Sequence, residues 1–179
     1  PTELEHVQNE TLDKLRPTIL VIDDEQDVRS FLFEAFKDTY NVIVAVDGDD
    51  GLKKLNKNLP QLVISDVMMP KLNGYELCEK IKSSTEFCHI PVILLTANDD
   101  TFKKIEGMEL GADDYVTKPF SIKYLEVRVK TLIENKQRIF EHYAMNSFMP
   151  KDALITSVRD KQFLEQINSS IEKNMSNSG

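Results

Sequence analysis

The sequence predicts an α/β fold: a doubly wound parallel sheet of five strands, followed by a helical C-terminal extension. Short, nearly continuous apolar runs rich in valine and isoleucine occur five times, as is typical of strands covered on both faces. The longer stretches between them carry apolar residues at three- to four-residue spacing, which predicts helices. Strands that alternate with helices form parallel sheets, because parallel neighbours need helical crossovers.

The elements follow one another in five strand–helix units. The predicted strands cover residues 18–22, 41–46, 62–65, 92–96 and 115–116. The apolar stripes of the predicted helices occupy residues 28–35, 52–55, 77–81, 105–108 and 122–133. Helix-breaking residues support these boundaries, since Pro60 closes the second helix, Gly74 precedes the third and Gly111 follows the fourth. The last stripe continues toward Phe140, which predicts one long helix from about residue 121.

The composition is typical of a soluble globular protein. With 41% hydrophobic and 29% charged residues, the chain has no apolar stretch near the roughly 20 residues that span a membrane. Its net charge of -8 argues against binding the phosphate backbone of nucleic acids, which needs a basic face. The two cysteines, Cys78 and Cys88, lack metal-ligand or redox spacing. We therefore expect a cytoplasmic segment that contacts neither nucleic acid nor a membrane directly.

Three regions of the chain differ in character. Residues 1–17 are polar and acidic and predict a linker, residues 18–136 contain all the strand–helix units, and residues 137–179 predict a helical extension. The single apolar helix face within that extension needs a partner surface on the main domain, on another chain or on a missing domain. The chain begins at Pro1 rather than at methionine, so we expect a piece of a longer protein.

Charged residues follow several strands at the point where each strand ends. Asp23 and Asp24 follow the first strand, Asp66 follows the third, Thr96 ends the fourth and Lys118 follows the fifth. The carboxyl ends of parallel strands meet at one edge of a sheet, where ligands gather. Carboxylates a few Å apart repel by roughly 4 kcal/mol per pair at an effective dielectric constant of 20, so such a cluster needs a cation. Mg²⁺ prefers oxygen ligands, and the lysine ammonium can hold a phosphoryl oxygen.

Four ordered motifs resemble the receiver domain of two-component response regulators. They are IDDE at 22–25, SDVMMPKLNG at 65–74, LTA at 95–97 and GADDYVTKPF at 111–120, and the resemblance covers residues 18–136. It implies a flavodoxin-like receiver fold with the strand order 2-1-3-4-5. It also implies that Asp66 is the phospho-acceptor. Asp24, Asp66 and the backbone carbonyl of Met68 would bind Mg²⁺ directly, and Asp23 would bind it through water.

The same resemblance assigns roles to five further residues. Lys118 would contact the acyl phosphate, and Pro119 would follow a cis peptide bond, which is essentially confined to proline. Thr96 would swing to hydrogen-bond the phosphoryl group, and Ala97 would leave room for it. Tyr115 would move inward together with Thr96.

The implied function is phosphorelay signal transduction. The chain would accept a phosphoryl group from a phosphohistidine of a histidine kinase domain, in cis or in trans, and would catalyse only its own phosphotransfer and dephosphorylation. The switch would act through the face formed by the fourth helix, the fifth strand and the fifth helix. That face would pair with another receiver or with an output module, which controls transcription. The alternatives are a stand-alone receiver adaptor and a phosphorylation-independent interaction module.

The tail carries a second resemblance. Residues 125–139 (LEVRVKTLIENKQRI) and 160–177 (DKQFLEQINSSIEKNMSN) are similar to the segment that joins a receiver to an AraC-type helix-turn-helix output in bacterial hybrid two-component sensors. This implies a parent sensor histidine kinase anchored in the inner membrane, with a DNA-binding module beyond residue 179.

Other interpretations of the charged residues are weaker. Asp23 and Asp24 could merely cap the first helix, but that does not explain the alignment with Asp66 and Lys118. A haloacid-dehalogenase-type phosphatase needs a second aspartate two residues after its nucleophile, and that position is Met68. Receiver-like modules that are not phosphorylated normally lack one of the acidic pair, the acceptor or the lysine, and all are present here.

Overall fold

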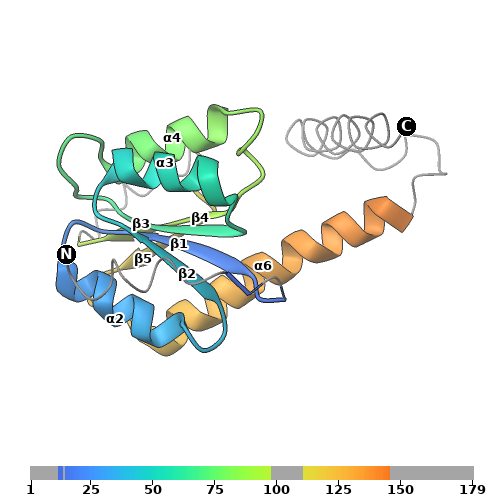
Figure 1. The fold of residues 1–179 in the computed structure, drawn as a ribbon, viewed down its shortest axis with the longest axis horizontal. Coiled ribbons are helices and arrows are strands. Elements are labelled where there is room, and N and C mark those ends of the chain that lie inside the picture. The colour runs from blue at the N-terminus through green and yellow to red at the C-terminus, as the bar shows by residue number, and fades with distance from the viewer. Residues whose placement is uncertain (1–11, 14, 98–110, 146–179) are drawn as a thin grey trace.

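The computed structural model describes residues 12, 13, 15–97 and 111–145 of the chain (Figure 1). Five strands form one parallel sheet in the order β2-β1-β3-β4-β5, which confirms the predicted fold class and strand order. The strands are β1 (Thr18–Ile22), β2 (Asn41–Ala45), β3 (Leu62–Asp66), β4 (Val92–Thr96) and β5 (Asp114–Thr117). Their bounds differ from the predicted ones by at most one residue at either end.

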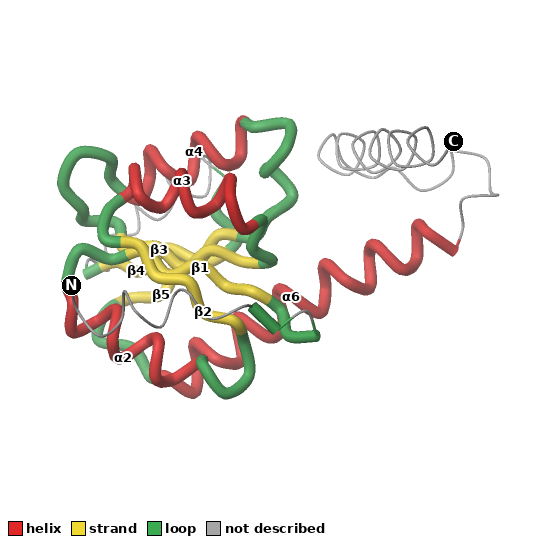
Figure 2. The backbone as a smooth tube through the Cα atoms, viewed as in Figure 1, coloured by secondary structure: helices red, strands yellow, loops and turns green. Residues whose placement is uncertain are grey.

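Helices cover both faces of the sheet. Helices α3 (Gly48–Asn58) and α4 (Gly74–Ser83) lie on one face, and α2 (Gln26–Phe36) and α6 (Ile122–Met145) lie on the other (Figures 1 and 2). The helix predicted near residues 105–108 lies outside the described residues. Two separate hydrophobic clusters, one on each side of the sheet, result from this layering.

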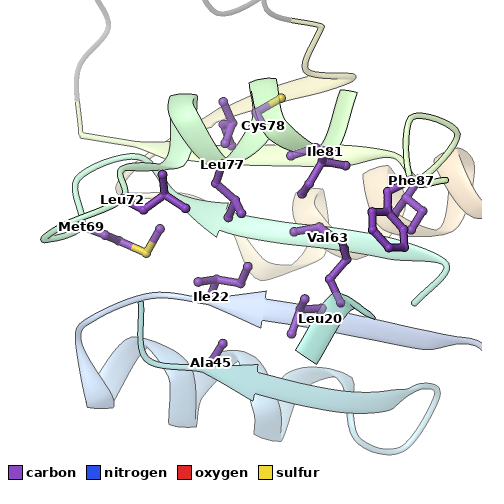
Figure 3. Close-up of a cluster of buried hydrophobic side chains, with 14 of the residues drawn as sticks. Leu20, Ile22, Ala45, Val63, Met69, Leu72, Leu77, Cys78, Ile81 and Phe87 are labelled. Atoms are coloured by element: carbon purple, nitrogen blue, oxygen red, sulfur yellow. The ribbon is translucent and has the colours of Figure 1, made fainter. Parts of the chain in front are cut away.

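The continuous apolar character of the strands follows from the two clusters. Leu20 and Ile22 face the cluster under α3 and α4, where Figure 3 shows them beside Val63. The intervening residues Ile19 and Val21 face the cluster under α2 and α6. Every residue of β1 is buried, so alternation between polar and apolar positions is absent. Burying each large aliphatic side chain stabilises the fold by about 1.5–3 kcal/mol.

Two helices begin at side-chain caps that fix the loops before them. The Asp47 carboxylate accepts a hydrogen bond from the Asp50 N–H at the start of α3. Asn73 and Glu76 form a reciprocal capping box at the start of α4. These caps satisfy N–H groups that have no partner within the helix. They therefore anchor both helix starts at the edge of the sheet where the strands end.

Gly74 lets the chain turn back tightly after β3. A Cβ atom at this position would lie 2.2 Å from the Asp66 carbonyl oxygen, which no side chain tolerates. The Gly74 N–H donates to the Val67 carbonyl oxygen at 3.0 Å. The start of α4 is thereby packed directly against the end of β3.

The last helix continues far beyond the sheet. Its buried stripe is Leu125, Val129 and Ile133, whereas Ile139 and Phe140 are 46% and 49% exposed. The helix runs past the sheet in Figure 1 and reaches Met145, five residues beyond the predicted end near Phe140. The prediction of one long helix is confirmed, and residues 146–179 of the predicted extension lie outside the described residues.

The segment before β1 is attached to the beginning of β2. The Asn41 side-chain amide donates to the carbonyl oxygens of Asp13 and Arg16 at 2.8 and 2.9 Å. Its oxygen accepts the Asp13 N–H at 3.1 Å, and the Arg16 guanidinium donates to the Lys37 carbonyl oxygen. The chain therefore enters the domain at the amino ends of the strands.

We predict that Gly74→Ala destabilises the protein by about 3 kcal/mol, because the new methyl group overlaps a backbone oxygen that cannot move away. Urea denaturation followed by circular dichroism measures this loss. Gly51→Ala is the matched control. Its Cβ would meet the end of the flexible Ile22 side chain at 2.5 Å, and alanine also favours the α3 helix by about 1 kcal/mol. A loss for Gly74→Ala no larger than that for Gly51→Ala would contradict the packing described here.

Candidate functional site

Four strands deliver polar side chains to the carboxyl edge of the sheet. Asp23 directly follows β1, Asp66 is the last residue of β3, Thr96 is the last residue of β4 and Lys118 directly follows β5. The parallel register aligns these strand ends, with Thr96 opposite Thr117. Because all the strands point the same way, residues up to 95 positions apart in sequence meet at this edge.

Asp66 is buried, and both of its carboxylate oxygens have partners. Its Oδ1 lies 2.7 Å from the Lys118 ammonium nitrogen. Its Oδ2 accepts a hydrogen bond of 2.7 Å from the Met68 N–H, two residues further along the chain. The carboxylate is thus held in one orientation by a charge on one side and by the backbone on the other.

Lys118 bridges two acidic residues. The Lys118 ammonium nitrogen lies 3.0 Å from Asp23 Oδ2 and 2.7 Å from Asp66 Oδ1. The Lys118 backbone N–H donates to the Thr96 carbonyl oxygen at 2.7 Å. Burial alone would lower the pKa of Lys118, but the hydrogen bonds to Asp66 and Asp23 outweigh burial and raise it. The lysine therefore stays charged at neutral pH. The predicted cis peptide bond between Lys118 and Pro119 is confirmed.

Asp23 is the most deeply buried acidic residue of the cluster, with no exposed surface. Burial raises the pKa of Asp23 above its ordinary value, although hydrogen bonds from the Glu25 N–H and from Lys118 act in the opposite direction. The backbone is tied as well, because the Arg29 guanidinium donates to the Asp23 carbonyl oxygen at 2.6 Å. Burial makes the charged form of Asp23 unfavourable, and a nearby cation reduces this penalty.

Asp24 lies on the outer side of the cluster. It is exposed and lines a cavity of about 370 Å³ together with residues of the loop after β3. Met68, which is 74% exposed, lines the same cavity. The predicted site residue Asp24 is therefore beside Met68, and Met68 is hydrogen-bonded to Asp66.

The donor set fits a hard divalent cation. Within the described residues, no group of three or more His, Cys, Asp or Glu side chains forms a ready metal cage. Mg²⁺ does not need one, because it commonly takes one or two carboxylates and keeps several waters. Asp24, Asp66 and the Met68 carbonyl offer oxygen donors of this kind. Two carboxylates, those of Asp23 and Asp66, contact the single Lys118 ammonium, and Asp24 follows Asp23 directly, so the cluster is negative and favours a cation.

The predicted switch residues occupy the neighbouring strands. Thr96 is buried, and Ala97 after it is exposed. Tyr115 is half-buried and packs against the hydrophobic cluster under α4. Its hydroxyl is buried and has no hydrogen-bond partner in the part of the chain that the structure describes. Burial raises the pKa of Tyr115, and Cys78 and Tyr75 add smaller contributions in the same direction.

One acidic residue at this edge was not predicted. Asp47 follows β2, is buried and lies 2.7 Å from the Lys71 ammonium nitrogen. Its position just after a strand is a usable sequence signal, because the same position identifies Asp23. No sequence signal pointed to Lys71 as its partner, because the two are 24 residues apart and the loop between β3 and α4 follows no regular pattern.

The arrangement matches a known family and solved structures. Residues 19–130 match the family described as the response regulator receiver domain. The fold is similar to the signal receiver domain of a signal transduction histidine kinase from Syntrophus aciditrophicus, with a TM-score of 0.64 and 30% identity. That similarity covers 79% of this chain and 99% of the solved chain.

Two curated relatives are longer proteins. Histidine kinase P4 of Formosa agariphila is 39% identical over 166 residues, which are 92% of this chain and 12% of that protein. The alkaline phosphatase synthesis transcriptional regulatory protein PhoP of Bacillus subtilis is 42% identical over 120 residues, which are 66% of this chain and 49% of that protein. The chain thus spans half or less of either relative. On its fold, its motifs and these matches, the chain belongs to the response regulator receiver domain family.

Proposed function

We propose that Asp66 accepts a phosphoryl group from a phosphohistidine of a histidine kinase domain, in cis or in trans. The observation that supports this most strongly is the oriented Asp66 carboxylate, held between the Lys118 ammonium and the Met68 N–H. A carboxylate oxygen of Asp66 attacks the phosphorus atom, the P–N bond to the donor imidazole breaks, and the imidazole leaves with its electron pair and takes up a proton. The product is an acyl phosphate on Asp66.

The residues around Asp66 supply what this transfer requires. Phosphoryl transfer depends mainly on in-line positioning and on neutralising charge at the phosphoryl oxygens. Lys118 provides a positive charge within 3.0 Å of both Asp23 and Asp66. Asp24, Asp66 and the Met68 carbonyl would hold Mg²⁺ directly and Asp23 would hold it through water, and the ion would supply further positive charge. Pro119 fixes the backbone that follows Lys118.

We propose further that phosphorylation biases a two-state switch. The phosphoryl group adds close to two negative charges, which Thr96 and Lys118 can bind, and the exposed Ala97 leaves room for it. A buried Tyr115 hydroxyl without a described hydrogen-bond partner is a group whose position can respond at little cost. The response would appear on β5, on α6 and on the helix predicted near residues 105–108. That predicted helix lies outside the described residues. This face would pair with a second receiver or with an output module.

The relatives support a place for this domain in a longer signalling chain. One is named a histidine kinase and the other a transcriptional regulatory protein. We propose a hybrid sensor parent in which residues 1–17 are a linker, 18–136 the receiver and 137–179 the connection to an AraC-type output that regulates transcription. No helix among the described residues has the length and apolar character needed to cross a membrane. The proposed location of the domain is the cytoplasm.

We predict that a small phosphodonor such as acetyl phosphate, with Mg²⁺, adds one phosphoryl group to the protein, detected by intact mass. Asp66→Asn should abolish the addition, because the amide is not a nucleophile for this reaction. Asp27→Asn, which alters an exposed acidic residue in the first turn of α2, is the matched control and should be phosphorylated normally. Phosphorylation of Asp66→Asn to the same extent would disprove the acceptor assignment.

We predict that Asp24→Asn weakens Mg²⁺ binding by about tenfold or more, equal to about 1.4 kcal/mol, because it removes a formal charge from the metal site and keeps the size. Isothermal titration calorimetry or amide chemical shifts measure the Kd for Mg²⁺. Asp27→Asn again serves as the control and should bind like the wild type. If Asp24→Asn titrates like the wild type, the metal assignment is wrong.

We predict that beryllofluoride with Mg²⁺, which mimics a phosphoryl group, shifts amide resonances of the wild type well beyond the Asp66 pocket, on β5 and along α6. Asp66→Asn should show none of these shifts. Thr96→Ala should keep local shifts near Asp66 but lose the distant ones, because the group proposed to transmit the change is absent. A wild-type response confined to the pocket would contradict the switch and leave the acceptor assignment intact.

A further inference from the structure

The loop between β3 and α4 is fixed at both of its ends. At its start the Val67 N–H donates to the Leu95 carbonyl oxygen at 2.9 Å, and the Met68 N–H donates to Asp66. At its end the Gly74 N–H donates back to Val67. Between these ends Met68, Pro70 and Lys71 are exposed, whereas Met69 and Leu72 are buried.

The middle of the loop is anchored by apolar side chains. Met69 and Leu72 are 8% and 9% exposed and extend into the hydrophobic cluster under α3 and α4, as Figure 3 shows. The first turn of α3 approaches the same part of the loop closely. A Cβ atom on Gly48 would lie 2.6 Å from the Leu72 carbonyl oxygen and 2.9 Å from Leu72 Cβ. The backbone of α3 and the backbone of the loop are therefore in direct contact.

Lys71 occupies the most strained position of the loop. Its φ angle is 68°, in the left-handed region that residues other than glycine seldom adopt. That conformation is unfavourable for an L-residue with a side chain, so it is stabilised when the residue makes a compensating interaction. The Lys71 ammonium nitrogen lies 2.7 Å from Asp47 Oδ2, which supplies one.

The Asp47 carboxylate is held in place by a second hydrogen bond, at the start of α3. Its Oδ1 accepts the Asp50 N–H at 2.9 Å, so one oxygen caps α3 and the other binds Lys71. The hydrogen bond from Lys71, followed by that from the Asp50 N–H, lowers the pKa of Asp47, and Asp47 in turn raises the pKa of Lys71. Both groups are therefore charged throughout the neutral pH range.

The ion pair contributes little to global stability. The Lys71 side chain is 68% exposed, and exposed ion pairs typically stabilise a protein only slightly because water and salt screen them. The more specific effect is local: the pair ties a strained loop residue, three positions after Met68, to a rigid helix start. The loop is thereby joined to the start of α3 both by this pair and by the close backbone contact at Gly48.

We propose that Asp47 and Lys71 are positioning residues for phosphoryl transfer, which act by holding the loop so that Met68 is presented to the metal and phosphoryl group beside Asp66. The proposal rests on the proposed function. Neither residue touches the reacting atoms. Losing the pair lets Lys71 leave its left-handed conformation, which displaces the Met68 backbone and loosens the metal site.

Two variants remove the ion pair and little else. Asp47→Asn keeps a good helix cap for α3 and loses the charge. Lys71→Met keeps the length of the side chain. Each should weaken Mg²⁺ binding by about three- to fivefold, the range that an exposed ion pair can transmit. The double variant should be no weaker than either single variant, because both act through one interaction.

The readouts separate positioning from stability. Phosphorylation by acetyl phosphate should slow at low Mg²⁺ concentration and recover at saturating Mg²⁺, while the urea midpoint changes little. Lys71→Arg should restore Mg²⁺ affinity, and high salt should bring the wild type toward the variants. Lys37→Met breaks the exposed Lys37–Glu34 pair at the far end of α2 and should leave Mg²⁺ affinity unchanged.

The outcomes distinguish this proposal from the one on which it rests. If the wild type neither binds Mg²⁺ nor becomes phosphorylated, the proposed function fails. If the wild type does both, and Asp47→Asn and Lys71→Met bind Mg²⁺ like the wild type, only the positioning role is overturned. Additive losses in the double variant would also overturn it, because independent effects are not a shared ion pair.

Discussion

A single ammonium group lies between two buried carboxylates at the carboxyl edge of the sheet, and the rest of the site depends on this balance of charge. At an effective dielectric constant of 20, unit charges about 4 Å apart interact with roughly 4 kcal/mol, so two neighbouring carboxylates would separate or take up a proton without Lys118. The balance requires the sheet to bring β1, β3 and β5 into register, because its three members come from the ends of those strands. The electrostatics of the site therefore depend directly on correct formation of the sheet. Helices on both faces bury the strands, and burial gives the charges at their ends a weakly screened environment.

Two different sets of contacts hold the site in place, one to Asp66 itself and one to the loop that carries Met68. Asp66 is oriented from within by Lys118 and by its own neighbour Met68, over distances of 2.7 Å. The loop that carries Met68 is oriented from outside by core side chains, by the tight turn at Gly74 and by the Lys71–Asp47 pair. Under the proposed function the inner contacts change with every cycle, because phosphorylation and the metal alter the charge at Asp66. The outer contacts do not involve the reacting atoms and can stay constant. Contacts that stay constant would keep the loop after β3 in place while the charge at Asp66 changes.

The sequence predicted the parts of this molecule that depend on local pattern. The strands were found because each is an apolar run, and the members of the charged cluster were found because each lies at the end of a strand or just after it. Other features depend on contacts between distant residues. Asp23 and Lys118 are 95 residues apart, and their 3.0 Å contact follows from sheet register and backbone direction rather than from any motif. Lys71 gave no signal, since a left-handed lysine looks like any surface lysine in a sequence. The buried hydroxyl of Tyr115 depends equally on the packing of α4.

The segment before β1 and the end of α6 both lie away from the candidate functional site. Asn41 fastens the incoming segment at the amino ends of the strands. The outgoing helix α6 starts after β5 and passes beyond that same end, over a length of about 36 Å for its 24 residues. Both described ends of the domain therefore lie on the side opposite the cavity beside Asp24 and Met68. A domain with both described ends on one side can be joined to other domains without a change at its carboxyl edge, and the chain matches 12% of one longer relative and 49% of another.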